Sequence, residues 1–278
     1  MDTLTASSLS RLQRILTEIG PMAVGFSAGV DSTLLLKVAV DILGAKAVGI
    51  TTVSPSLPAC EKEEARALAL LLGARHWFVE SAELEDPRYR ENNERRCYFC
   101  KSELFKILRK EADALGLASI AYGAQRDDLG EFRPGMVAAR EAGARAPLLE
   151  VGLGKQEIRG LSRELGLPTW NKPAMACLAS RIPHGTPIAK EDLARVEAAE
   201  ARLRGEGFRL FRVRARGSEA RLELSREEMG RLNDPELRER VAEGILASGF
   251  ARVFFDPEGY RPGGGATFTL SPSPGERG

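Results

Sequence analysis

One corner of the chain, residues 22–43, restricts the possible folds more than any other stretch. An apolar run at 22–26 predicts a buried strand, residues 27–29 form a tight turn, and a helical pattern begins directly at Asp31. The free N–H groups and the dipole of a helix's first turn attract anions, and Gly29 lets the backbone approach one closely. The corner therefore predicts a phosphate-binding site. The alternative is an ordinary strand-to-helix turn capped by Ser or Asp.

The polar groups of this corner support nucleotide binding. Ser27, Ser32 and Thr33 supply hydroxyl donors, and the backbone of Gly29 and Val30 completes the expected contacts. A carboxylate beside polyphosphate is repelled unless it binds a metal or orients a reacting group, so we expect the aspartate that opens the helix, Asp31, to help hold Mg²⁺. The Walker P-loop is excluded, because the sequence contains neither Gly-Lys-Ser nor Gly-Lys-Thr.

Strands and helices alternate through the first half of the chain. Strands are expected at 22–26, 47–53, 76–80 and 119–122, and helices at 9–20, 31–43, 61–72, 102–115, 137–141 and 155–165. This alternation predicts an α/β fold with a doubly wound, mainly parallel sheet, whose ligands bind at the carboxyl ends of the strands. Thr51 and Gly123 lie at two such ends, and we assign both to the adenosine side of a bound nucleotide.

From Leu167 onward the sequence changes character, because prolines become frequent. A helix is expected at 190–204, strands at 210–216, 220–224 and 252–255, and two helices before Ala247, which together predict a small α+β domain with an antiparallel sheet. We therefore divide the chain into a nucleotide-binding domain at 1–168, a cysteine-bearing junction at 169–188, a substrate or oligomerisation domain at 189–258 and a disordered tail at 259–278, rich in Gly, Pro and Ser.

Composition excludes several classes of protein. Of the 278 residues, 43% are hydrophobic, which supports two cores. Lys plus Arg (40) and Asp plus Glu (39) nearly balance, so the net charge of +1 argues against binding to nucleic acid or to a membrane. The first residues lack a signal-peptide pattern and no long apolar run follows, so we expect a cytoplasmic protein. We also expect it to be a homo-oligomer.

The four cysteines of the chain, at 60, 97, 100 and 177, are too few and too uneven for a disulfide scaffold. Cys97 and Cys100 form a Cys-x-x-Cys motif at an expected helix start beside cationic side chains, which favour the thiolate form. The spacing alone also suits a zinc ribbon or a redox pair. Structural zinc takes four ligands, however, and Cys177 is the remaining candidate sulfur, so three thiolates suit a [4Fe-4S] cluster with one iron left open.

Four motifs taken together point to a family. The corner is similar to the PP-loop Ser-Gly-Gly-x-Asp-Ser, with Ala28 where that pattern has Gly, and a methyl group there is expected to crowd pyrophosphate or oppose a positive φ. The others are Arg-Cys-Tyr-Phe-Cys-Lys at 96–101, Asp-Asp-Leu-Gly-Glu-Phe-Arg-Pro-Gly at 127–135 and Asn-Lys-Pro-Ala-Met-Ala-Cys-Leu-Ala-Ser-Arg-Ile-Pro-His-Gly at 171–185. Over nearly its whole length the chain resembles the LarE family of ATP-dependent sulfur transferases.

The resemblance implies an enzyme of nickel-pincer cofactor biosynthesis, the cofactor of lactate racemase. Such enzymes adenylate a carboxylate of pyridinium-3,5-biscarboxylic acid mononucleotide with ATP, release pyrophosphate and install sulfur as a thiocarboxylate. One subgroup sacrifices the cysteine matching Cys177, which becomes dehydroalanine. Another holds a [4Fe-4S] cluster on cysteines matching Cys97, Cys100 and Cys177. Because this chain has all three, we favour the cluster type, with the three sulfurs converging near the phosphate-binding corner; the ultimate sulfur donor is open.

The resemblance also assigns side chains to the substrate. Arg212 and Arg214 match an Arg-x-Arg pair that binds the mononucleotide phosphate, and as alternate residues of a strand they point to one face. Glu200 and Glu223 match acidic residues near the active site. Asp128, or its neighbour Asp127, is a second candidate for Mg²⁺. The catalytic candidates are Asp31, Cys177, Ser180 and Arg181.

Three other functions compete with this reading. A tRNA-thiolating enzyme of the PP-loop type also uses a three-cysteine cluster, but it needs a broad basic surface that a net charge of +1 does not provide. An amide-forming synthetase shares the adenylate but has no use for the cysteines. A non-catalytic nucleotide-binding protein would accommodate the departure at Ala28.

Overall fold

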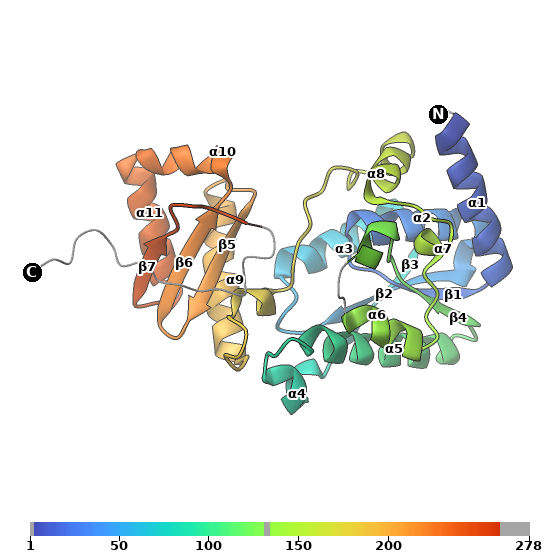
Figure 1. Ribbon diagram of the computed structural model, residues 1–278, viewed down its shortest axis with the longest axis horizontal. Coiled ribbons are helices and arrows are strands. Elements are labelled where there is room, and N and C mark those ends of the chain that lie inside the picture. Colours follow the sequence, from blue (N-terminus) through green and yellow to red (C-terminus); the bar gives the residue numbers. More distant parts are fainter. Residues whose placement is uncertain (1–2, 131–133, 262–278) are drawn as a thin grey trace, which may run out of the picture. The chain divides into compact units, whose positions relative to one another are not determined.

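The computed structural model describes residues 3–130 and 134–261, which form two compact units (Figure 1). Unit 1 contains residues up to Arg90 together with 95–176, and unit 2 contains 91–94 together with the chain from Cys177. Residues 131–133 of the motif at 127–135 and most of the predicted tail, 262–278, lie outside the described residues. Within the described part of the chain, no helix is both long and apolar enough to cross a membrane.

Unit 1 is built on a four-stranded parallel sheet. The strands are β1 (Met22–Gly25), β2 (Ala47–Val53), β3 (Arg75–Glu80) and β4 (Ser119–Ala121), in the order β3-β2-β1-β4. Every neighbouring pair runs parallel, which confirms the predicted α/β class with a mainly parallel sheet. The chain leaves β1 toward β2 on one side and returns to β4 on the other, so the carboxyl ends of β1 and β4 flank a switch point of the topology.

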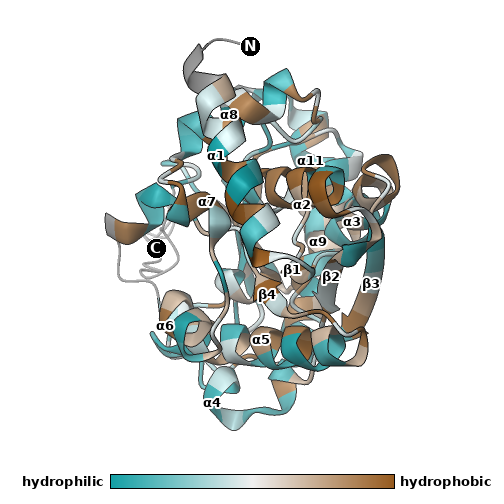
Figure 2. Ribbon diagram, turned by 90° about the vertical axis from the view of Figure 1, so that its right-hand side faces the viewer, coloured by the Kyte–Doolittle hydropathy of each residue, from teal (hydrophilic) through white to brown (hydrophobic). Residues whose placement is uncertain are grey.

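Helices cover both faces of this sheet (Figure 1). On one face, α1 (Thr3–Ile19), α2 (Val30–Leu43), α3 (Ala59–Leu71) and α8 (Lys155–Glu164) share one hydrophobic core; on the other, α5 (Arg96–Ala114) and α6 (Pro134–Glu141) share a second. Val24 faces the first core and its neighbour Ala23 the second, as the alternation of a strand requires. The apolar α2 is conspicuous in the hydropathy view (Figure 2). Short helices complete the unit: Gly44–Lys46, Glu83–Glu85, α4 (Pro87–Arg90), Arg126–Gly130 and α7 (Pro147–Glu150).

Unit 2 is a three-stranded sheet packed with helices. Its strands are β5 (Phe211–Arg216), β6 (Glu219–Leu224) and β7 (Arg252–Phe255), and its helices are α9 (Lys190–Gly205), α10 (Arg226–Met229) and α11 (Pro235–Leu246), with 3-10 turns at Leu178–Arg181 and Gly230–Asn233. β5 and β6 pair antiparallel, but β6 and β7 pair parallel. The expectation of an antiparallel sheet is therefore wrong for β7. The helical segment between β6 and β7 is long enough for the crossover that a parallel pair requires.

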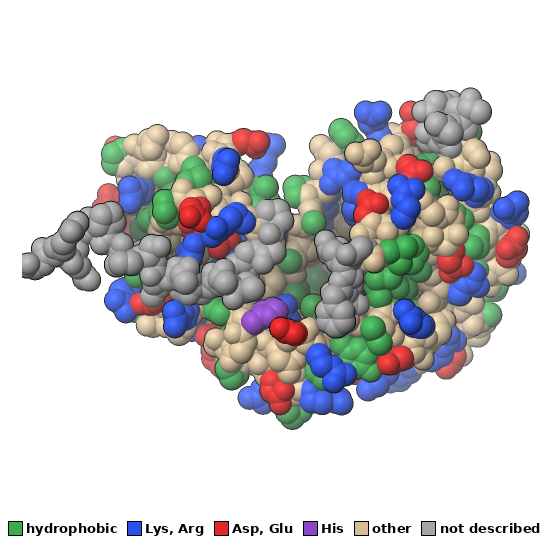
Figure 3. Space-filling model, in the orientation of Figure 1, with side chains coloured by type: hydrophobic (Ala, Val, Ile, Leu, Met, Phe, Trp, Pro, Cys, Tyr) green, Lys and Arg blue, Asp and Glu red, His purple; other side chains and the backbone are tan. Residues whose placement is uncertain are grey.

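Charged side chains of both signs are intermixed on one face of the molecule. On the face shown in Figure 3, Lys and Arg lie among Asp and Glu rather than gathering in a field of one sign. This distribution agrees with the net charge of +1.

Candidate functional site

Hydrogen bonds made by its own serines fix the backbone of the predicted phosphate-binding corner. The Oγ atoms of Ser27 and Ser32 lie 3.1 Å apart, the Ser27 N–H donates to the Ser32 Oγ over 3.2 Å, and the Ser32 hydroxyl donates to the carbonyl of Gly29 over 3.3 Å. Gly29 is the N-cap of α2, and no side chain caps the helix. The first N–H groups of α2 are therefore not taken up by a side-chain cap, as an anion site requires.

Ala28 adopts the left-handed conformation that favours glycine. Its φ is 55° and its methyl group is fully buried. A non-glycine residue in this region costs about 1–2 kcal/mol. The methyl group therefore does not prevent a positive φ at this position, although it adds strain to the turn.

Gly123 allows β4 to meet the first turn of α2. A Cβ at this position would lie 3.0 Å from the nitrogen of Ser32 and 3.2 Å from the carbonyl carbon of Asp31. Only glycine fits without a shift of the helix start. The residue predicted for the adenosine side therefore has a packing role at the switch point.

Asp31 is paired with a lysine that the sequence patterns did not single out. The Nζ of Lys155 lies 2.7 Å from Oδ1 and 2.6 Å from Oδ2 of Asp31. Burial nevertheless raises the pKa of Asp31, with Lys155 lowering it and the nearby Asp128 raising it. Lys155 is the first residue of α8, where the helix dipole disfavours a cation. A lysine at such an unfavourable position therefore indicates that its ammonium has a specific partner.

The predicted second magnesium ligands are engaged in the same region. The Asp127 carboxylate accepts the backbone N–H of Lys155 over 2.9 Å, and the buried Asp128 carboxylate accepts that of Gln125 over 2.9 Å. Both carboxylates therefore fix the loop that follows β4, and Asp128 lies near enough to Asp31 to influence its pKa.

Thr51 links two strands of the sheet. Its hydroxyl donates to the carbonyl of Phe26 over 2.6 Å and lies 2.8 Å from the Nε2 of His76. Burial, assisted by the charge of Arg66, lowers the pKa of His76 to about 4. The Thr51 side chain, predicted for the adenosine side, thus has structural partners of its own.

A second lysine missed by the sequence analysis supports the corner. Lys172 donates to the carbonyl of Ala28 over 3.2 Å and pairs with Glu61 at 3.0 Å and Glu64 at 2.8 Å. Its side chain is only 13% exposed. Lys172 therefore connects the strained turn, the helix α3 and the segment that precedes Cys177.

Cys97 and Cys100 lie at the start of α5, as predicted. Cys97 is exposed and Cys100 is half-buried, whereas the exposed Cys177 belongs to unit 2. Across residues 3–130 and 134–261, no group of three His, Cys, Asp or Glu side chains could hold a metal ion. The three-cysteine cluster stays a prediction.

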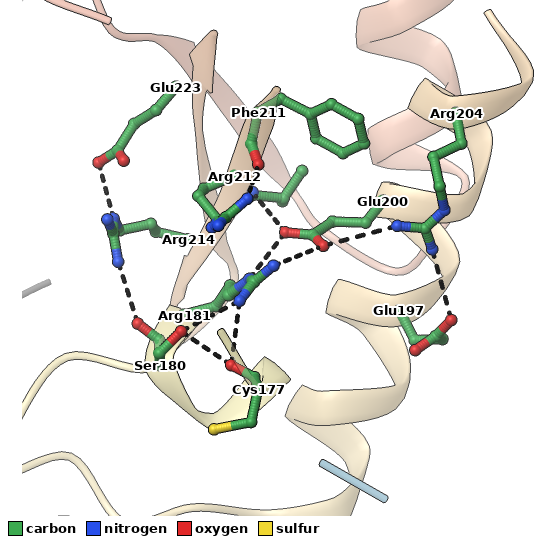
Figure 4. A network of polar contacts seen from close by, with 11 residues as sticks. Cys177, Ser180, Arg181, Glu197, Glu200, Arg204, Phe211, Arg212, Arg214 and Glu223 are labelled. Atoms are coloured by element: carbon green, nitrogen blue, oxygen red, sulfur yellow. Dashed lines mark hydrogen bonds and ion pairs between the residues drawn. The ribbon is translucent and has the colours of Figure 1, made fainter. Parts of the chain in front are cut away.

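In unit 2 the structure gathers the other predicted side chains around Cys177 and Ser180 (Figure 4). Arg181 is fully buried and pairs with Glu200 through two contacts, of 2.9 Å from Nε and 3.0 Å from Nη2. Its Nη1 donates to the carbonyl of Cys177 over 3.0 Å and to the hydroxyl of Ser180 over 3.1 Å. Arg181 thereby fixes the backbone that carries the thiol.

The arginine pair of β5 completes this cluster. Arg214 pairs with Glu223 at 2.7 Å and donates to the carbonyl of Ser180 over 3.0 Å. Arg212 donates to the carbonyl of Phe211 over 2.6 Å, and burial together with the charge of Arg181 lowers its pKa.

We call these five nearly buried side chains the arginine cluster: Arg181, Arg212, Arg214, Glu200 and Glu223. It contains three guanidinium groups and two carboxylates. Guanidinium groups gathered in one place suit an anion with several acceptor oxygens, such as a phosphate.

The chain thus belongs to the class of two-unit proteins in which a parallel α/β unit with an uncapped helix start is joined to a unit with buried arginines beside a cysteine, two features that are each suited to an anion. Comparison with known proteins narrows the class. The chain is 35% identical over 259 residues to the pyridinium-3,5-bisthiocarboxylic acid mononucleotide synthase of Lactiplantibacillus plantarum, covering 93% of both proteins. It therefore belongs to the family of that synthase, the LarE family.

Two uncharacterized proteins are also similar to it. One, from Synechocystis sp., is 45% identical over 258 residues, covering 92% of this chain and 96% of that protein. The other, from Methanocaldococcus jannaschii, is 27% identical over 238 residues, covering 86% of this chain and 90% of that protein. No protein-family model matches the chain.

Proposed function

We propose that this protein uses ATP to convert a carboxylate of pyridinium-3,5-biscarboxylic acid mononucleotide into a thiocarboxylate. The observation that carries the proposal is the arginine cluster, in which Arg181 and Arg214 bind the backbone carbonyls of Cys177 and Ser180. The cluster brings the charge needed for a mononucleotide phosphate to the loop that bears the thiol. The relative from L. plantarum, named as the synthase of the bisthiocarboxylic acid mononucleotide, supports the same substrate.

The corner in unit 1 is proposed to take the phosphates of ATP, as a PP-loop does. A substrate carboxylate oxygen attacks the α-phosphorus, the bond to the β-phosphate oxygen breaks, and pyrophosphate leaves with that electron pair. The uncapped N–H groups at the start of α2 and the hydroxyls of Ser27 and Ser32 are suited to the oxygens of the leaving group. Binding of adenosine beside Thr51 and Gly123 remains part of the proposal.

Mg²⁺ is proposed to bind at this corner through Asp31, with Asp128 as the second carboxylate. When bound, the metal offsets charge on the phosphates. Lys155 contacts both carboxylate oxygens of Asp31. When the metal binds, this contact would break, Asp31 would bind the metal, and the Lys155 ammonium would contact the phosphates instead.

Sulfur transfer replaces AMP on the activated acyl carbon. Attack by a sulfur nucleophile forms the carbon–sulfur bond, and AMP leaves with the electrons of its acyl oxygen bond. A [4Fe-4S] cluster, when bound, supplies such a sulfide on its open iron. Cys97 and Cys100 suit it as ligands, because residues three apart share one helix face. Cys177 would be the third ligand.

Cys177 acting as the donor itself is the second candidate mechanism. Its thiol is exposed and its backbone carbonyl is held by Arg181, so the side chain is presented on a fixed loop. Attack of this thiol on the acyl adenylate gives a thioester. Loss of the Cα proton and cleavage of the Cβ–S bond then release the thiocarboxylate and leave dehydroalanine.

Pyrophosphate release with and without the pyridinium substrate tests the function. We expect release that depends on this substrate and a matched amount of thiocarboxylate. Release without it, or none with it, would point to another substrate or to a non-catalytic nucleotide-binding protein. A salt-sensitive shift of tRNA on a gel would instead favour a tRNA-thiolating enzyme.

Anaerobic purification followed by iron and sulfide analysis tests the cluster. We expect both elements in the wild-type protein and neither in the double variant Cys97→Ala/Cys100→Ala. We also expect the double variant to lose multiple turnover. If it still forms one equivalent of product per protein, the sulfur comes from Cys177 and the cluster assignment is wrong.

A further inference from the structure

The chain does not leave unit 2 at the end of β7 but folds back over the sheet. Residues 256–260, which we call the C-terminal strap, begin with Asp256, whose carboxylate accepts the N–H of Glu258 over 2.9 Å. The N–H of Gly259 donates to the carbonyl of Asp256 over 3.2 Å, and that of Tyr260 to the carbonyl of Leu224 over 2.7 Å. Gly259 and Tyr260, assigned to the tail in the sequence analysis, therefore belong to the folded unit.

Two features fix the strap in this place. The buried carboxylate of Asp256 pairs with Arg221 of β6, with Nε 2.8 Å from Oδ2. Gly259 has a φ of 72°, and a Cβ there would lie 2.6 Å from the carbonyl oxygen of Leu224. Only glycine permits so close an approach to the end of β6. The strap is thus built to bring the next residue, Tyr260, to one position.

At that position the face of the Tyr260 ring lies against the guanidinium of Arg212. The guanidinium carbon of Arg212 lies 4.9 Å from the centre of the Tyr260 ring. The Arg212 side chain is almost fully buried, with 4% of the residue exposed. A ring in contact with a guanidinium restricts the directions in which its N–H groups point.

The two arginines of β5 are thereby held by different means. Glu223 fixes Arg214 and neutralises it, at a distance of 2.7 Å. Tyr260 contacts Arg212 through its ring, which helps to orient the guanidinium. A guanidinium that is oriented in advance suits a ligand that arrives as an anion.

We propose that Tyr260 is a positioning residue for the substrate phosphate, because the C-terminal strap holds its ring against Arg212 and so presents the guanidinium edge to that anion. The inference rests on the proposed function, in which Arg212 and Arg214 take the phosphate of the pyridinium mononucleotide. It adds to the substrate site a residue that lies beyond the last strand.

Calorimetric binding of pyridinium-3,5-biscarboxylic acid mononucleotide to Tyr260 variants of the full chain tests the inference. Tyr260→Leu should raise the Kd about three- to twentyfold, because the π face is lost. Tyr260→Phe keeps that face and should stay within about twofold of wild type. In turnover assays Tyr260→Leu should raise the KM for the mononucleotide, while kcat and the KM for ATP stay unchanged. Equal Kd values for all three proteins would overturn the inference.

A matched control comes from the same unit. Phe255 lies 4.9 Å from the guanidinium of Arg238, a pair of similar geometry outside the arginine cluster. Phe255→Leu should leave the Kd for the mononucleotide unchanged. A rise equal to that of Tyr260→Leu would mean that any loosening of unit 2 weakens binding, which contradicts a specific role for Tyr260.

Arg212→Gln separates failure of the inference from failure of the proposed function. If Arg212→Gln binds the mononucleotide as tightly as wild type, the proposed role of Arg212 is wrong. If Arg212→Gln binds weakly but Tyr260→Leu binds normally, only the inference fails. In the double variant, Tyr260→Leu should add no further loss to Arg212→Gln, because its effect acts through the guanidinium.

Discussion

The ammonium of Lys155 sits between the two carboxylate oxygens of Asp31, at 2.7 and 2.6 Å, and so joins the start of α8 to the first turn of α2. The contact brings together two residues that are 124 positions apart in the sequence. It places a cation and a carboxylate beside the uncapped first turn of α2. Both groups therefore lie where the proposed reaction accumulates negative charge on pyrophosphate.

Lys155→Met should lower the rate of pyrophosphate release about 10- to 100-fold, because a cation aimed at the leaving group is lost. Burial raises the pKa of Asp31 and Lys155 opposes that rise, so the variant should raise this pKa further. Activity that needs ionised Asp31 should then require a higher pH, and the acidic limb of the pH–rate profile should move upward. Lys37→Met, which breaks an exposed pair with Asp41 on α2, is the control. An unchanged acidic limb would show that Lys155 does not act through Asp31.

Lys172→Met should lower the free energy of unfolding by about 2–3 kcal/mol, because Glu61 would keep a nearly buried charge without this partner. The loss should appear in urea denaturation of the intact chain. Lys106→Met removes an exposed contact with Glu103 at 4.0 Å and should change stability little. Equal midpoints for Lys172→Met and Lys106→Met would contradict the role assigned to Lys172.

Substitutions at Ala28 should separate conformation from chemistry. Ala28→Gly relieves a left-handed alanine, which is worth about 1–2 kcal/mol, but loses a buried methyl group and makes the unfolded chain more flexible. We expect a net change within about 1 kcal/mol and retained pyrophosphate release. Ala28→Val, with a branched side chain at the same φ, should lose more than about 2 kcal/mol. A valine variant as stable as wild type would mean that the turn is not held in this conformation.

Stability should fall as the pH drops from about 6.5 to about 4, in part because of His76. The folded protein keeps His76 neutral down to a pKa of about 4, whereas in the unfolded chain the imidazole takes up the proton near its ordinary pKa of 6.5. Protons bound only by the unfolded state favour unfolding in this range. His76→Gln should lose less stability than wild type between pH 7 and pH 5, as measured by urea denaturation. Parallel losses in both proteins would place the effect elsewhere.

Local sequence patterns predicted much of unit 1. The bounds of β2, 47–53, follow from a run of apolar and β-branched residues, and α2 ends as expected at Gly44, which has a φ of 55°. Such elements depend on burial and turn chemistry that neighbouring residues encode. The direction of β7 does not depend on such local signals, because it is set by the crossover that packs α11 on the sheet.

The residues of the candidate site divide in the same way, into those that sequence patterns predict and those that depend on distant contacts. Motifs identified the corner and the cysteines, and the family resemblance supplied the five members of the arginine cluster. They did not identify Lys155, Lys172 or Tyr260, whose long side chains reach partners that are distant in sequence. Nothing near these residues in the chain encodes those partners, although a lysine at a helix start conflicts with the dipole and so hints at one.

The most direct test of the account is a mass-spectrometric assay of the pyridinium mononucleotide after anaerobic incubation with this protein, ATP and a sulfide source, alongside the pyrophosphate released. The proposed function predicts a product in which sulfur replaces a carboxylate oxygen, with one pyrophosphate released for each sulfur installed. Pyrophosphate without any sulfur-containing product, or an unaltered mononucleotide with ATP intact, would contradict it.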